Sequence, residues 1–117
     1  MASQSRDQLW EPRLWLLQRV TAVALALWVG VHLITILAVG GAGLSAEQIL
    51  GRTRHSAVVA LFYGSFVLLA AIHGALGVRV LIAEWTPWRG TRRDGAAVLV
   101  AVLLVALGGR ALWAVVT

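Results

Sequence analysis

The sequence predicts an all-α integral membrane protein with three transmembrane helices. Of its 117 residues, 60% are hydrophobic and only 13% are charged, whereas a soluble domain averages about 45–50% apolar and about a quarter charged residues. The mean hydropathy of +0.84 points the same way. Three apolar runs reach the roughly 20 residues that cross a bilayer. We therefore expect residues 1–117 to form a single membrane domain.

The chain opens with a polar and aromatic stretch, followed by the first apolar run. Residues 1–18 contain Trp10, Trp15 and several charged side chains, with Pro12 among them. Such a composition is typical of a segment that lies on the membrane surface. We expect the first transmembrane helix over 19–40, because the chain then becomes rich in glycine.

Two further helices follow in the sequence pattern. The second is expected over 56–83, where Glu84 ends the apolar run, and the third over 96–117. Residues 41–55 then form an outer loop and residues 84–95 a cytoplasmic loop.

The charges predict the orientation of these helices. The net charge of +5 comes from ten basic residues against five acidic ones. Arg52 and Arg54 flank one side of the predicted membrane, and more arginines flank the other, namely Arg6, Arg13, Arg19, Arg89, Arg92 and Arg93. The positive-inside rule places the N-terminus in the cytoplasm, in a bacterial-type inner membrane. Arginines at the ends of apolar runs do not indicate nucleic-acid binding.

Few side chains in the predicted spans are capable of chemistry. The chain has no cysteine, which excludes disulfides, iron–sulfur clusters held by this chain and thiolate zinc sites. No nucleophile–base pair is readable either, so we predict no catalytic residue. Ionisable groups inside a bilayer are costly and mark cofactors, proton paths or partners. The polar residues in the spans are Thr21, His32, His73, Arg79 and Arg110.

The two histidines in the spans are predicted to lie at different depths. His32 follows Arg19 by 13 residues, or about 19 Å of helix, and His73 precedes Glu84 by 11 residues, or about 16 Å. The two axial nitrogens of one haem iron are only about 4 Å apart, so this offset argues against a haem shared by both rings. We expect either two haem b groups, each with one ligand from this chain and one from a partner helix, or none.

Other residues could surround such haems, and each of them also has a role that does not involve haem. Gly77 lies one turn after His73 and leaves room for a macrocycle or for helix packing. Arg79 could pair with a haem carboxylate or extend toward the membrane surface. His55 could lie near an outer haem or be a solvated loop residue, and Arg110 could contact haem, lipid or another subunit.

Short motifs in the first two spans resemble a known family. The stretch Gln18–Ala22 followed by His32, and Ile72–Arg79 running to Glu84-Trp85, resemble the membrane-anchor cytochrome b subunits of succinate dehydrogenase and fumarate reductase, respiratory complex II. The resemblance implies three helices, with His73 as a haem ligand. His32 matches the first-helix ligand of members that bind two haems.

The resemblance also implies partners and a substrate. A soluble flavoprotein with FAD and an iron–sulfur subunit would oxidise succinate or reduce fumarate, seated on this anchor, with quinone as the membrane substrate. Arg19, Thr21, Glu84 and Trp85 are the expected quinone-site residues. A second anchor chain, either a sister subunit or another copy, would complete the haem ligands.

Two other classes of function are compatible with the residues. A haem-free structural or assembly subunit would use the histidines for hydrogen bonds between helices. A small proton-coupled transporter subunit would use His32 and His73 as proton relays.

Overall fold

The computed structural model describes the backbone of residues 2–40 and 43–117, and side chains from Trp10 onward within those ranges. This part of the chain is helical: α1 (Ala2–Gly40), α2 (Ala46–Thr53), α3 (Ala57–Trp85) and α4 (Thr91–Val116). Three stretches are long and apolar enough to cross a membrane, namely Trp10–Gly40, Ala57–Trp85 and Thr91–Val116. The predicted all-α membrane fold with three spans is confirmed.

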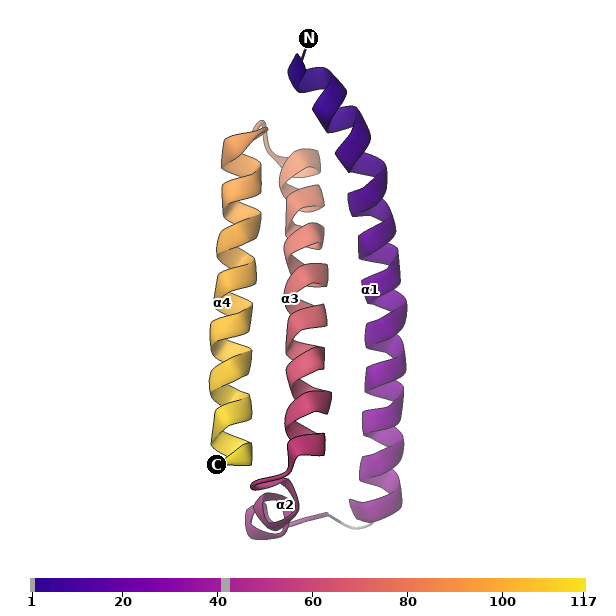
Figure 1. The fold of residues 1–117 in the computed structure, drawn as a ribbon, viewed down its shortest axis with the longest axis vertical. Helices are drawn as coiled ribbons and strands as arrows, with labels where there is room; N and C mark the ends of the chain where they lie inside the picture. Colours follow the sequence, from indigo (N-terminus) through magenta and orange to yellow (C-terminus); the bar gives the residue numbers. More distant parts are fainter. Residues whose placement is uncertain (1, 41–42) are drawn as a thin grey trace.

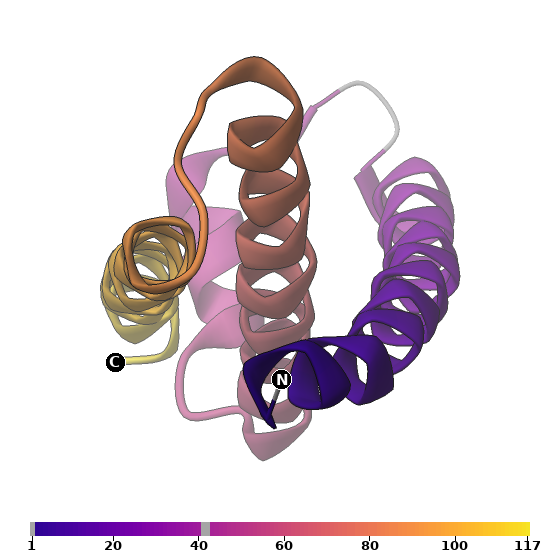
Figure 2. The same cartoon turned by 90° about the horizontal axis from the view of Figure 1, so that it is seen from above.

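The three long helices run side by side, with α3 between α1 and α4 (Figures 1 and 2). The N-terminus and the α3–α4 loop lie at one end of the bundle, which we call the N-terminal end. Helix α2 and the C-terminus lie at the other, the α2 end. This arrangement leaves α3 as the element that contacts both of the other long helices.

Helix α1 is longer than the sequence predicted. It continues for 39 residues with Pro12 inside it, so the residues before Arg19 belong to the same helix as the span predicted over 19–40. A proline removes one hydrogen bond and bends a helix, but it ends one only when the neighbouring turns cannot compensate. Here Arg13–Gln18, rich in leucine, carry the helix onward.

The predicted outer loop contains a short helix, α2. Its first turn is closed by a capping box, in which Ser45 Oγ accepts from the Gln48 N–H at 3.2 Å and Gln48 Oε1 accepts from the Ser45 N–H at 2.9 Å. The Ser-x-x-Gln spacing is the sequence signature of this motif.

The end of α2 and the turn after it are hydrogen-bonded to the last turn of α4. Thr53 Oγ1 donates to the Val115 carbonyl at 2.7 Å, and the His55 N–H donates to the Val116 carbonyl at 2.8 Å. The last carbonyls of a helix have no partner within the helix. The α2–α3 turn therefore caps α4.

Helices α3 and α4 pack through small residues. Ala71 and Ala97 are the buried apolar residues among the described side chains, at 2% and 7% exposure. A Cβ on Gly74 would lie 2.9 Å from Leu104 Cδ1, and one on Gly108 would lie 2.7 Å from Val67 Cγ1. Small residues at such contacts let membrane helices approach closely.

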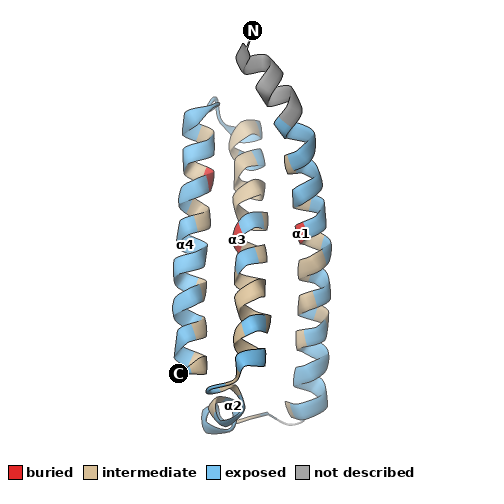
Figure 3. Ribbon diagram, in the orientation of Figure 1, coloured by how far each residue is buried: buried red, intermediate tan, exposed pale blue. Residues whose placement is uncertain are grey.

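Most other side chains are exposed (Figure 3). Large apolar residues are among them, with Leu37 at 76% and Val58 at 78%. An apolar exterior of this extent fits a surface that faces lipid or other membrane helices.

Candidate functional site

Helices α1 and α3 are joined by polar contacts at four levels along their length. We call this series the polar ladder. From the N-terminal end to the α2 end, its pairs are Glu11 with Arg79, Gln18 and Thr21 with His73, Trp28 with Phe62 and Ser65, and His32 with Tyr63. Each histidine of the spans therefore belongs to a different level.

The ring of His73 is held at Nδ1. This nitrogen lies 3.2 Å from the Gln18 carbonyl oxygen and 3.2 Å from Thr21 Oγ1. A carbonyl only accepts, so Nδ1 carries the proton. Thr21 is itself buried and donates to the Leu17 carbonyl at 2.8 Å, which leaves its oxygen free to accept from Nδ1. Nε2 then carries a lone pair, as a metal-binding imidazole requires.

The ring of His32 is held differently. Its Nδ1 lies 2.6 Å from the Tyr63 hydroxyl oxygen. A phenol can donate to this nitrogen or accept from it, so the contact is compatible with either tautomer of the ring. The two histidines are thus both held at Nδ1, one by a hydroxyl of α3 and the other by groups of α1.

The contacts also fix the separation of the two rings. His73 is level with Thr21, which precedes His32 by 11 residues on α1. At 1.5 Å per residue the offset is about 16 Å. The predicted difference in depth is thus present, and the two rings of one chain cannot ligate one iron.

Arg79 joins all three long helices at the N-terminal end. Its Nη2 donates to Glu11 Oε1 at 2.7 Å and its Nε to Asp94 Oδ1 at 3.0 Å, while the side chain is 14% exposed. The sequence interpretations, a haem carboxylate or extension toward the surface, both missed these partners. Glu11 is 68 residues away in the chain, so no local pattern signals it.

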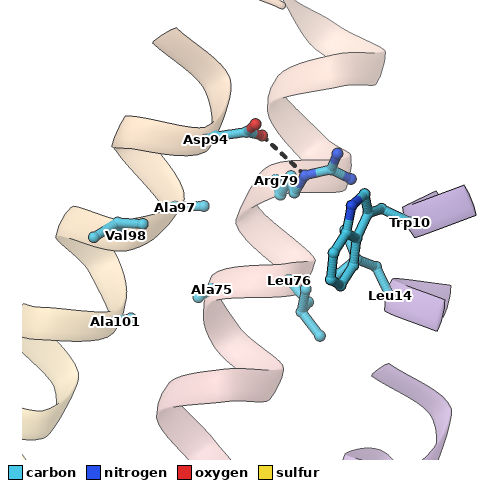
Figure 4. Close-up of a pocket in the computed structure, with 9 residues that line it drawn as sticks. All are labelled: Trp10, Leu14, Ala75, Leu76, Arg79, Asp94, Ala97, Val98 and Ala101. Atoms are coloured by element: carbon cyan, nitrogen blue, oxygen red, sulfur yellow. Dashed lines mark hydrogen bonds and ion pairs between the residues drawn. The ribbon is translucent and has the colours of Figure 1, made fainter. Parts of the chain in front are cut away.

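A cavity of about 330 Å³ lies beside this contact. Trp10 and Leu14 from α1, Leu76 from α3 and Ala97 from α4 are among its lining residues (Figure 4). The indole faces the α3 side of the cavity, close to the guanidinium of Arg79. The cavity thus has a charged edge and an apolar wall.

The structure separates the expected quinone-site residues. Arg19 is exposed, with its guanidinium 5.0 Å from the centre of the Trp15 ring. Thr21, by contrast, is buried against α3. Glu84 and Trp85 end α3 and are exposed, Trp85 at 82%.

These positions are too far apart to form one cluster within this chain. The neighbours of Arg19 contact His73, which precedes Glu84 by 11 residues, so Arg19 and Glu84 differ in height by about 16 Å. Arg19 therefore does not lie beside Glu84 and Trp85 within this chain. The reason is that α1 continues well beyond Arg19, which is therefore not at the helix end.

The remaining expected haem neighbours lie in three different settings. Gly77 faces α1, where an added Cβ would be 4.0 Å from Gln18 Nε2. His55 occupies the α2–α3 turn, exposed, with a positive φ of 58°. Arg110 is exposed on α4.

One comparison with known proteins gives a match. The family described as succinate dehydrogenase/fumarate reductase transmembrane subunit matches residues 10–109, which is most of the chain. The chain belongs to this family. No match was found among curated proteins or among solved structures.

The protein is thus a multi-pass membrane anchor subunit of complex II. Among the described side chains, no three His, Cys, Asp or Glu residues converge as a metal site would require. An axial haem ligand needs only one imidazole per chain. His73 fits that role because Gln18 and Thr21 hold its Nδ1, which leaves Nε2 available.

Sequence reasoning missed the partners of the histidines in this anchor. Tyr63, Trp28 and Ser65 are polar groups within the spans, and a buried phenol or indole needs a hydrogen-bond partner. Trp28 Nε1 donates to the Phe62 carbonyl at 3.1 Å and lies 3.0 Å from Ser65 Oγ. That requirement was a usable signal, although the sequence does not say which partner each group finds.

Proposed function

We propose that this anchor subunit holds haem b through Nε2 of His73 and passes electrons between the iron–sulfur subunit and quinone. The observation that carries the proposal is the pair of contacts from His73 Nδ1 to the Gln18 carbonyl and to Thr21. Bound haem supplies a one-electron store between the iron–sulfur clusters and quinone.

The residues around His73 have distinct tasks in this proposal. The Gln18 carbonyl and Thr21 hydroxyl hold the ring and increase the basicity of Nε2, as outer partners of metal-binding histidines do. Gly77 leaves the neighbouring turn of α3 free of a side chain. The second axial ligand comes from another anchor chain, either a sister subunit or a second copy.

The orientation proposed for the complex follows from the charges. Arg89, Arg92 and Arg93 lie at or beside the α3–α4 loop, at the N-terminal end, which we place in the cytoplasm of a bacterial-type cell. The flavoprotein and the iron–sulfur subunit dock there. Because this chain has no cysteine, the iron–sulfur clusters belong to a partner, as does FAD.

The proposed quinone site is shared between subunits. Glu84 and Trp85 are exposed in the last turn of α3, at the N-terminal end of the bundle, where the soluble subunits would dock. Trp85 can donate a hydrogen bond to a quinone oxygen, and Glu84 can return a proton to the reduced ring. Arg19 lies at a deeper level, so a partner chain has to supply the cation that polarises the carbonyl.

The proposal is tested by a reduced-minus-oxidised spectrum of the purified complex, with pyridine haemochrome quantitation. We expect His73→Ala to abolish the haem b absorbance contributed through this chain. His55→Asn is the matched control, because it removes an imidazole from an exposed turn and asparagine tolerates the positive φ. Retention of full haem content in assembled His73→Ala complex would sink the proposal.

A second variant tests the role of Thr21. Thr21→Val keeps the shape but removes the acceptor beside Nδ1, so the ring becomes a weaker electron donor and the haem midpoint potential should rise. Thr21→Ser should restore it. An unchanged potential in Thr21→Val would show that the hydroxyl does not act on the ligand.

A further inference from the structure

We propose that Trp28 and Arg79 are positioning residues, which fix α1 at the register where Gln18 and Thr21 reach Nδ1 of His73. The inference rests on the proposed function for the role of His73. It goes further because it assigns a task to two residues that do not themselves contact the imidazole.

The α1 side of the polar ladder follows a seven-residue spacing. Gln18 follows Glu11 by seven residues, His32 follows Gln18 by fourteen, and Trp28 follows Thr21 by seven. Two helices that pack along one seam repeat their contacts every seven residues. The polar groups therefore form the seam through which α1 faces α3.

Trp28 fixes α1 on one side of the His73 contact. Its Nε1 donates to the Phe62 carbonyl at 3.1 Å and lies 3.0 Å from Ser65 Oγ. Its ring stacks on that of Phe62 with 5.9 Å between the ring centres. The directional bond to the α3 backbone opposes sliding of α1, and the stacked rings oppose its rotation. Trp28 lies about 10 Å of helix from Thr21.

Arg79 fixes α1 on the other side. It donates to Glu11 at 2.7 Å and to Asp94 on α4 at 3.0 Å. Because α4 also binds the guanidinium, Glu11 contacts a group that is itself held in place. Glu11 precedes Gln18 by seven residues, which is again about 10 Å of helix. The contact of His73 is thus bracketed at similar distances on both sides.

The contacts of His73 depend on this register. Both distances from Nδ1 are 3.2 Å, at the long end of the range for N–H donors, so a small displacement of α1 weakens them. Apolar side chains do not supply the register, because lipid chains solvate them as well as a neighbouring helix does. The register is therefore set by the polar contacts that flank His73.

Trp28 gives the cleaner test, because removing the charge of Arg79 would itself change the potential of a nearby haem. The purified complex with Trp28→Phe is compared with wild type by redox titration and by electron paramagnetic resonance of the oxidised haem. We expect the midpoint potential to rise, as in Thr21→Val, and the resonance signal to broaden. In the Thr21→Val background, Trp28→Phe should add less than it does alone, because both changes act through Nδ1.

Gly108→Ala is the matched control, because it perturbs the contact between α3 and α4 and leaves the polar ladder in place. An equal change of potential in Gly108→Ala and Trp28→Phe would reduce the effect to a general loss of stability and overturn the inference. An unchanged potential in Trp28→Phe would also overturn it.

A readout that needs no haem separates this inference from the proposed function. Deuterium exchange at the imidazole C2–H of His73, followed by mass spectrometry, should be at least about twofold faster in Trp28→Phe than in wild type. Exchange as slow as in wild type would overturn the inference even where haem is bound through His73. Faster exchange, together with full haem content in His73→Ala, would support the inference and contradict the proposed function.

Discussion

Replacing Gly108 with alanine tests the contact between α3 and α4. The new Cβ would lie 2.7 and 2.8 Å from the Val67 Cγ atoms and 3.3 Å from its Cβ. A β-branched side chain on a helix has essentially one rotamer, so Val67 cannot swing aside. Overpacking of this kind costs about 1–3 kcal/mol. Alanine also gains about 1 kcal/mol of helix propensity over glycine, which offsets part of the cost.

The neighbouring glycine provides the control. An alanine at Gly109 would meet no described atom within 4 Å. Both substitutions make the same change in the same helix, so the propensity gain cancels when they are compared. We expect Gly108→Ala to be less stable than Gly109→Ala by about 1–3 kcal/mol.

The assay is unfolding of the purified protein in mixed micelles as the fraction of sodium dodecyl sulfate is raised, followed by circular dichroism. Val67→Ala should rescue Gly108→Ala, because it removes the methyl groups that the new Cβ meets. If Gly108→Ala and Gly109→Ala unfold together, the reasoning about this contact fails.

Three further predictions concern hydrogen bonds between elements. Arg79→Gln should lower the free energy of unfolding by about 1–3 kcal/mol, because it removes charged hydrogen bonds to α1 and α4. Arg79→Lys should restore only part of this stability, because an ammonium group cannot donate along two edges as a guanidinium does. Identical stability of wild type and Arg79→Gln in the same micelle assay would contradict this. Trp28→Phe should lower the free energy of unfolding by about 1 kcal/mol, because it removes the hydrogen bonds of the indole N–H to α3 but keeps an aromatic ring. A melting temperature equal to that of wild type would argue against those bonds. Thr53→Val should accelerate amide hydrogen exchange in the last turn of α4, because the Val115 carbonyl loses the hydrogen bond from Thr53. Exchange as slow as in wild type would show that this hydrogen bond does not stabilise the end of α4.

The helices could be predicted from sequence, but not their lengths. The apolar runs of about 20 residues fix the number of spans because the bilayer sets that length. The length of α1 was not anticipated, because the charged and aromatic residues before residue 19 predicted a separate surface segment, whereas one helix runs from Ala2 to Gly40. Helix α2 was missed because eight residues carry too little apolar periodicity, and only the Ser45 capping box marks it.

The candidate site could be predicted in part. The depths of His32 and His73 follow from counting residues, since the rise of a helix is constant. Their hydrogen-bond partners do not, because Tyr63 and Gln18 lie 31 and 55 residues away from them. The setting of each ring is therefore defined only when the helices are packed.

The length of α1 has a mechanical consequence. Its 39 residues span about 58 Å, close to the 59 Å extent of the molecule, and a hydrocarbon core of about 30 Å accounts for roughly 20 of them. The remainder, which contains Pro12, extends beyond that thickness as part of the same helix. Glu11, Gln18 and Thr21 thus belong to one continuous helix that contacts both Arg79 and His73. A displacement of this helix along its axis would shift the partners of both side chains together.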